Sequence, residues 1–219
     1  MHALVESFLL IYAGLFPVVN PVGSAPIFLA LTAFQSETMR RSLARRVALN
    51  GFLLLLGSLF VGSHVLTFFG ISLPVLRIGG GLAVASFGWT MLRDGVQPAR
   101  ETEEVDQDSP VDAFYPLTMP LTVGPGSISV AVALGAQRPQ EVENLTDITL
   151  VGLAAVAGLA AMGLTIFLCY RFAGRMTSWL GATGTNVMVR LSAFILLCIG
   201  IQIIWSGYAA LMGIPTRLH

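Results

Sequence analysis

Six segments of the chain are long and apolar enough to cross a lipid bilayer, and this restricts the fold more than any other feature. A helix spanning the hydrocarbon core needs about 20 mostly apolar residues. The segments are residues 4–33, 47–69, 73–92, 114–136, 148–172 and 187–212. Only 11% of the residues are charged and 55% are hydrophobic, whereas roughly 25% of the residues of a soluble domain are charged. The sequence therefore predicts a polytopic membrane protein.

The six segments are expected to be helices. Only helices and closed barrels satisfy every backbone polar group within hydrocarbon, and apolar runs such as residues 51–56 (GFLLLL) lack the alternation of a barrel strand. The first segment differs from a signal peptide, because it lacks a positively charged start and its apolar stretch is too long. Cys169 and Cys198 fall within predicted spans and are interpreted as small packing residues.

The placement of arginine predicts the orientation of the chain. The first, third and fifth loops carry most of the arginines: Arg40, Arg41, Arg45, Arg46, Arg93, Arg100, Arg171 and Arg175. The opposite side has only Arg138 and Arg217. Basic loops stay in the cytoplasm, so both termini are expected outside. The net charge of zero and the lack of a basic block give no reason to expect nucleic acid as a partner.

The chain contains a weak internal repeat at an offset of 103 residues. The matched pairs are Pro17 and Pro120, Gly23 and Gly126, Ser24 and Ser127, and Ala30-Leu31 and Ala133-Leu134. Each half has three predicted spans, so the second half must enter the membrane from the opposite side. Such inverted repeats are common in secondary transporters. The predicted units are residues 1–92, an acidic cytoplasmic linker at 93–113, and residues 114–219.

The first helix of each half is predicted to be broken. Pro17, Pro21 and Pro26 interrupt the first span, and Pro116, Pro120 and Gly124-Pro125-Gly126 interrupt the fourth. Each proline removes a backbone donor and clashes with the preceding turn. Irregular backbone within a membrane is tolerated only where protein or a water-filled cavity satisfies it. Because the halves are inverted, the two breaks are expected to meet near the midplane.

These breaks form the candidate binding site. The second half-helices are expected to begin near Gly23 and Gly126, where N-terminal amides favour an anionic group. The predicted substrate-binding residues are Asn20, Pro21, Gly23, Ser24, Gly124, Pro125, Gly126, Ser127 and Ser129. Such a site suits a small zwitterionic solute, with its carboxylate toward the helix ends. The alternative is that both kinks serve packing alone.

The residues around both breaks resemble a known family. Residues 20–28 (NPVGSAPIF) and 120–126 (PLTVGPG) are similar to the signature segments of the MarC family of bacterial inner-membrane proteins. Residues 70–81 and 184–190 are similar to parts of its third and sixth spans. The resemblance implies a six-span protein of the bacterial inner membrane, and it favours small neutral amino acids as cargo; with the orientation given by the arginines, both termini are expected in the periplasm.

Two arginines lie within predicted spans. Arg77 and Arg190 occupy equivalent positions early in the third and sixth spans. Either each side chain extends to the membrane interface, or it supports the site by holding freed carbonyls or a substrate carboxylate. All carboxylates lie in loops or at span edges, so a proton relay is difficult to build. No cofactor or metal is expected; if transport is ion-coupled, Na⁺ held by carbonyls, Asn20 and hydroxyls is chemically easier.

The function predicted from the sequence is a secondary transporter or exporter of small neutral amino acids or similar metabolites. A solute channel with paired half-helices and a membrane scaffold without transport activity are the alternatives. An enzyme is not expected, because the spans hold no Ser/His/Asp set, zinc motif or paired acids. Small residues at Gly79, Gly80, Gly81 and Ala85 permit close helix contacts. Internal packing is the simpler explanation, and a homo-oligomer is the other.

Overall fold

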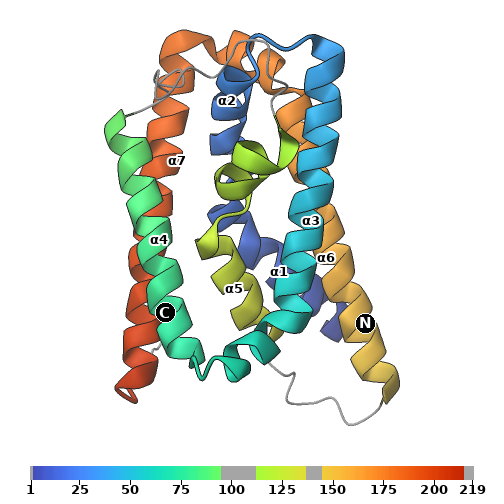
Figure 1. The fold of residues 1–219 in the computed structure, drawn as a ribbon, viewed down its shortest axis with the longest axis vertical. Helices are drawn as coiled ribbons and strands as arrows, with labels where there is room; N and C mark the ends of the chain where they lie inside the picture. Colours follow the sequence, from blue (N-terminus) through green and yellow to red (C-terminus); the bar gives the residue numbers. More distant parts are fainter. Residues whose placement is uncertain (1, 95–111, 137–144, 215–219) are drawn as a thin grey trace.

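The structure, a computed structural model, describes residues 2–94, 112–136 and 145–214. These residues form helices and no strand (Figure 1). The helices are α1 His2–Val19, α2 Pro21–Leu31, α3 Glu37–Phe68, α4 Leu73–Asp94, η1 Ala113–Thr122, α5 Pro125–Gly135, α6 Leu145–Arg171 and α7 Ala173–Leu211. Within these described residues, four helices are long and apolar enough to cross a membrane, and up to six spans result if each bent pair counts as one. The prediction of an all-helical membrane protein is confirmed.

Both predicted breaks are present. The chain bends by 44° between α1 and α2, and by 68° between η1 and α5. The second half-helices begin at Pro21 and Pro125, slightly earlier than the expected starts near Gly23 and Gly126. Proline suits the first position of a helix, because the amide that it lacks would have no partner there. The η1 segment also contains non-helical backbone at Tyr115 and Met119.

The broken pairs lie between two pairs of long helices. In Figure 1, α4 and α7 run together on the left, α3 and α6 on the right, and the bent helices fill the space between them. The main core is formed by buried apolar side chains of the bent pairs, α3 and α6. A small separate cluster of Met91, Val189 and Ala193 joins α4 to α7. The breaks themselves therefore lie between the two pairs of long helices, while the start of α1 and the start of η1 are exposed.

The helices α3 and α7 begin well before the spans predicted at 47 and 187. The hydroxyl of Ser36 accepts a hydrogen bond from the Met39 amide and caps α3, so Arg40 and the next three arginines lie on a helix. The α7 helix begins at Ala173 and bends at Gly181, which has a φ of 67°. The length of an apolar stretch predicts how much of a helix lies in lipid. It does not predict where the helix begins or ends.

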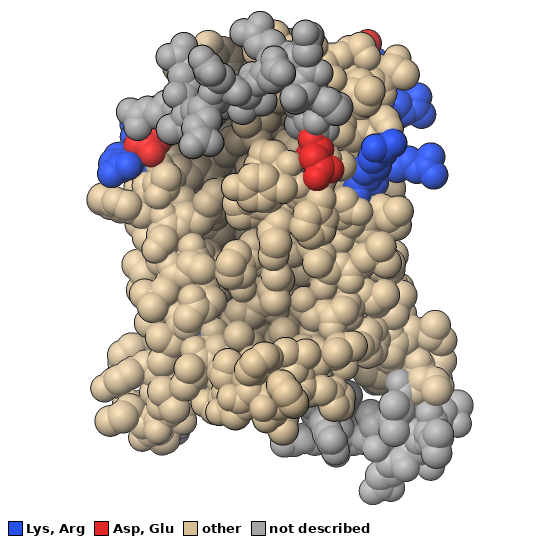
Figure 2. All heavy atoms as spheres, viewed as in Figure 1, with Lys and Arg blue, Asp and Glu red and all other residues tan. Residues whose placement is uncertain are grey.

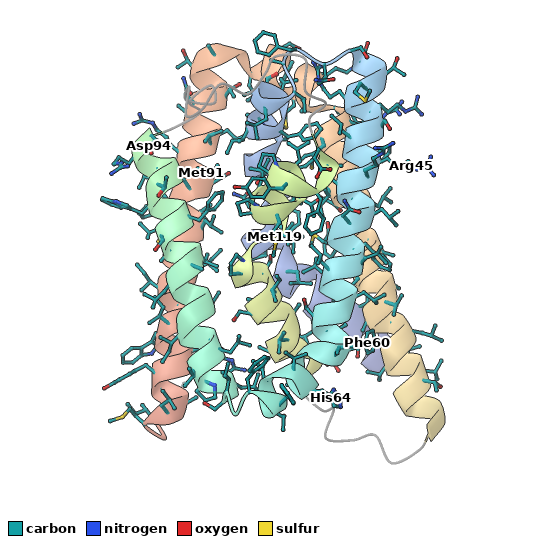
Figure 3. The ribbon with its side chains drawn as sticks, in the orientation of Figure 1. Arg45, Phe60, His64, Met91, Asp94 and Met119 are labelled. Atoms are coloured by element: carbon teal, nitrogen blue, oxygen red, sulfur yellow. The ribbon has the colours of Figure 1, made fainter. Side chains whose placement is uncertain are left out.

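Most of the described arginines lie toward one end of the molecule, whereas Arg77 lies near the start of α4, at the opposite end. Among the described residues visible in Figure 2, charged side chains occur only toward the upper end, where α3 begins, α4 ends and α6 meets α7 (Figure 1). Figure 3 shows Arg45 and Asp94 near this end and His64 near the other. The start of α1 and the end of α7 both lie toward the lower end (Figure 1). Assignment of the arginine-bearing end to the cytoplasm stays a prediction.

Small residues bring α4 and α7 into close contact, as their pattern predicted. A Cβ atom at Gly81 would lie 2.8 Å from the carbonyl oxygen of Gly200, and one at Gly200 would lie 2.9 Å from the Cβ of Ala85. A Cβ at Gly79 would meet nothing within 4 Å. Gly81, Ala85 and Gly200 thus pack within this chain.

We expect Gly81→Ala to destabilise the protein and Gly79→Ala to leave its stability unchanged or raise it. The methyl group at position 81 overpacks the contact between α4 and α7, at a cost of about 1–3 kcal/mol. At position 79 the same change only improves helix propensity. Thermal unfolding of the two variants in detergent measures the difference. Equal melting temperatures would contradict the assignment of this contact.

Candidate functional site

Asn20 shapes the first break. Its backbone is left-handed, with φ 47° and ψ 54°, a conformation that asparagine tolerates better than most residues. Its Oδ1 accepts a hydrogen bond of 3.1 Å from the amide of Gly23. A Cβ at Gly23 would lie 2.7 Å from the Cβ of Ser192 and would collide with the Asn20 side chain. The start of α2 is therefore capped by this chain itself.

The Nδ2 atom of Asn20 has a different environment from its oxygen. It is buried, and no acceptor lies within hydrogen-bond distance among the residues that the structure describes. A buried amide donor without a partner is unfavourable. The first break therefore contributes one unused donor.

The second break lacks a side-chain cap. Gly124 precedes α5 in an extended conformation, with φ −98° and ψ 179°, and no side chain caps the helix. The Ser127 hydroxyl donates to the Gly124 carbonyl at 3.0 Å instead. Within the described part of the chain, the amides of Gly126 and Ser127 have no acceptor. This helix end can therefore bind an anionic group.

A cavity of about 180 Å³ lies beside the second break. Its walls come from α1, α4, η1, α5 and α7, and include Val18, Phe87, Leu196 and all four residues from Gly124 to Ser127. None of the lining residues is charged. Pockets for drug-sized ligands measure roughly 300–1,000 Å³, so this cavity suits a smaller solute.

Buried hydroxyls connect the two broken pairs to α6. The Thr122 Oγ1 lies 2.7 Å from the Leu117 carbonyl and 2.7 Å from the Tyr170 hydroxyl. Since the single Thr122 proton goes to the carbonyl, the Tyr170 hydroxyl donates to Thr122. The Ser24 hydroxyl donates to the Leu121 carbonyl at 3.5 Å, and this contact links α2 to η1. We call Ser24, Thr122 and Tyr170 the hydroxyl cluster.

The structure divides the predicted binding residues into two groups. Gly124, Pro125, Gly126 and Ser127 line the cavity. The others surround the breaks without lining it: Asn20, Pro21, Gly23, Ser24 and Ser129. Ser129, for example, donates to the Leu76 carbonyl at 3.1 Å and ties α5 to α4.

The two arginines proposed as supports stand apart from this cavity. Arg77 is half-buried on α4 and Arg190 is exposed on α7. Among the described residues, neither guanidinium has a hydrogen bond or an ion pair; the ion pair found there joins Arg93 to Asp94 at 2.9 Å. The supporting role of Arg77 and Arg190 stays a prediction.

Sequence reasoning missed Thr118, Thr122 and Tyr170 as parts of the site. A signal was present for the threonines, because Pro-Leu-Thr occurs at both 116–118 and 120–122. Each threonine hydroxyl donates at 2.7 Å to a carbonyl five residues earlier. The irregular η1 backbone thereby receives donors from its own side chains. Tyr170 lies 48 residues away from Thr122 along the chain, and no local pattern marked it.

Comparison with known proteins identifies the family. The model described as MarC family integral membrane protein matches residues 5–212. The chain belongs to this family.

Relatives in several organisms match this MarC-family chain over most of its length. The UPF0056 membrane protein YhcE of Escherichia coli is 31% identical, covering 90% of this chain and 89% of its own. The UPF0056 inner membrane protein MarC of Salmonella arizonae is 30% identical, covering 88% and 90%. YvbG of Bacillus subtilis, also a UPF0056 membrane protein, is 29% identical, covering 94% and 96%. No solved structure matches the chain.

We expect Thr122→Val to be more destabilising than Tyr170→Phe. Valine removes the acceptor that Thr122 offers to the buried Tyr170 hydroxyl and also removes the donor to the buried Leu117 carbonyl, which costs about 1–3 kcal/mol. Phenylalanine at position 170 removes the hydroxyl donor and with it the need for an acceptor. Thr122 keeps its hydrogen bond to the Leu117 carbonyl. Thermal unfolding of both variants and of the double variant tests this order. A double variant that loses the full sum of both single effects would argue against the hydrogen bond.

Proposed function

We propose that this MarC-family protein is a secondary transporter or exporter of small neutral amino acids or similar small metabolites. The observation that carries the proposal is the uncapped start of α5 beside a small, uncharged cavity. The amides of Gly126 and Ser127 would bind the carboxylate of the solute. Its amine would lie toward carbonyls that the prolines leave without a helical partner. The chemistry is binding alone, so we propose no enzymatic step, cofactor or metal centre.

An inverted arrangement of residues 1–92 and 114–219 is part of the proposal. Gly70 lies just before α4 and Gly181 lies at the bend within α7, and both have a φ of 67°. The α2 helix packs on α7, while α5 packs on α4, so each second half-helix contacts the last helix of the opposite half. These pairings support two halves that rock about a shared centre, as in other transporters built from repeats.

The proposed location is the bacterial inner membrane, with six spans and both termini in the periplasm. The α1 start and the α7 end lie toward the same end of the molecule (Figure 1), opposite the starts of α3 and α7, which carry Arg40, Arg41, Arg45, Arg46 and Arg175, in agreement with the positive-inside rule. The linker at 93–113 would then be cytoplasmic; residues 95–111 lie outside the described part of the chain.

Purified protein in proteoliposomes tests the function directly. We expect saturable uptake and counterflow of radiolabelled alanine, glycine or serine, because the cavity is small and uncharged. Equilibration without counterflow would favour a channel. An absence of flux for all three solutes, with correctly inserted protein, would overturn the proposed cargo. Repeating the assay with and without a Na⁺ gradient tests ion coupling.

Position 124 offers a sharper test of the carboxylate site. Gly124→Ser supplies a hydroxyl that can cap the α5 amides, as Asn20 caps α2, and it would compete with the carboxylate of the solute. Gly124→Ala adds the same Cβ, which would lie 3.3 Å from the Pro120 carbonyl oxygen, without a capping oxygen. We expect the serine variant to bind the solute roughly tenfold more weakly than the alanine variant, and to unfold at a higher temperature.

Equilibrium binding and thermal unfolding measure the two effects at position 124. If serine and alanine weaken binding equally, the added volume is responsible and the amides of α5 do not hold the solute.

A further inference from the structure

A second and larger cavity lies at the arginine-bearing end, away from the breaks. Its volume is about 420 Å³, and it is bounded by the first turns of α3 and by the junction of α6 and α7. Four arginines line it: Arg40, Arg41, Arg171 and Arg175. Glu37 is the one acidic residue in the lining. We call this site the basic cavity.

The guanidinium of Arg40 is fixed in place and incompletely paired. Its Nη2 donates to the carbonyls of Thr32 and Gln35, both at 3.2 Å. Its Nε is buried and has no acceptor among the described residues. A buried charged donor without a partner is unfavourable, so the charge of Arg40 is not fully compensated by the described residues.

The two arginines on the opposite wall are also positioned. The guanidinium carbons of Arg171 and Arg175 each lie 5.5 Å from the centre of the Phe172 ring. Contact with a ring face leaves the N–H edge of a guanidinium available for a ligand. None of the four arginines forms an ion pair within residues 2–94, 112–136 and 145–214. The basic cavity therefore contains a surplus of oriented, unpaired positive charge.

The surroundings of the cavity indicate the depth at which it lies. Phe34 follows α2 and is 96% exposed, and Trp179 lies before the bend of α7 and is 84% exposed. Exposed tryptophan and tyrosine side chains concentrate where a membrane meets water, which places Trp179 at this level. Basic pockets between membrane helices at this level can hold phospholipid head groups.

We propose that the basic cavity binds a phosphate group, and that an anionic phospholipid supplies it. The guanidinium fork matches phosphate oxygens in pairs, and four such forks with one carboxylate favour a group with at least one full negative charge. The exposure of Trp179 favours a lipid over a soluble source. This site shares no lining residue with the cavity at the second break.

The test compares melting temperatures of the full-length protein in detergent with added dioleoyl-phosphatidylglycerol, dioleoyl-phosphatidylcholine or inorganic phosphate. We expect phosphatidylglycerol near saturation to raise the melting temperature by about 5 °C relative to phosphatidylcholine. The double variant Arg171→Gln/Arg175→Gln should lose this shift. The matched control is Arg45→Gln/Arg46→Gln, which removes the same charge from exposed positions outside the lining and should keep the shift.

Each further outcome bears on the proposal. An equal shift with inorganic phosphate, lost in Arg171→Gln/Arg175→Gln, supports the phosphate site and assigns a soluble source. If neither phosphatidylglycerol nor inorganic phosphate raises the melting temperature, the proposal is overturned. It is also overturned if both double variants lose the shift in melting temperature equally, because this indicates general attraction to a charged surface. If the melting temperature instead rises only after Glu101, Glu103 and Glu104 are replaced by glutamine, the chain's own acidic linker occupies the cavity. This result would also overturn the proposal.

Discussion

Backbone that leaves the helical path inside a bilayer must find its hydrogen bonds within the protein, and this constraint governs the centre of the molecule. At the first break, Asn20 supplies an acceptor for the Gly23 amide. In η1, Thr118 and Thr122 supply donors to carbonyls five residues earlier. These short polar side chains satisfy the bent backbone without adding charge. They allow both breaks to lie in an otherwise apolar core.

The amides at the two breaks find hydrogen-bond acceptors within the protein to different extents, and this difference distinguishes the two breaks. The α2 helix is capped by Asn20, so an anion could reach the Gly23 amide only by displacing the Asn20 side chain. The α5 helix begins without such a cap, beside a cavity. The two breaks are thus unequal, since the residue before each helix decides whether its amides are free. The offset of 103 relates Gly23 to Gly126, but the residues before the two helices, Asn20 and Gly124, lie 104 residues apart and are not matched by it.

Local sequence signals predicted the breaks well, because proline and glycine act on their own backbone. The same signals placed the second half-helices slightly late, at Gly23 and Gly126, since they did not weigh proline's preference for the first helical position. The pairing of Thr122 with Tyr170 depends on how α6 packs against η1, and no local pattern contains that information. The basic cavity escaped notice for a related reason. Its arginines were assigned to loops, whereas α3 and α7 extend beyond their apolar lengths.

The last turn of α6 joins the two sites. Tyr170 is fully buried, stacks on Phe28 with ring centres 4.4 Å apart, and donates to Thr122. The next residue, Arg171, lines the basic cavity. Successive side chains on a helix point about 100° apart, so one rigid turn serves both environments. Movement of η1 must either carry this turn along or break the bond between Tyr170 and Thr122. A phosphate group held between α3 and the α6–α7 junction would resist the first of these movements.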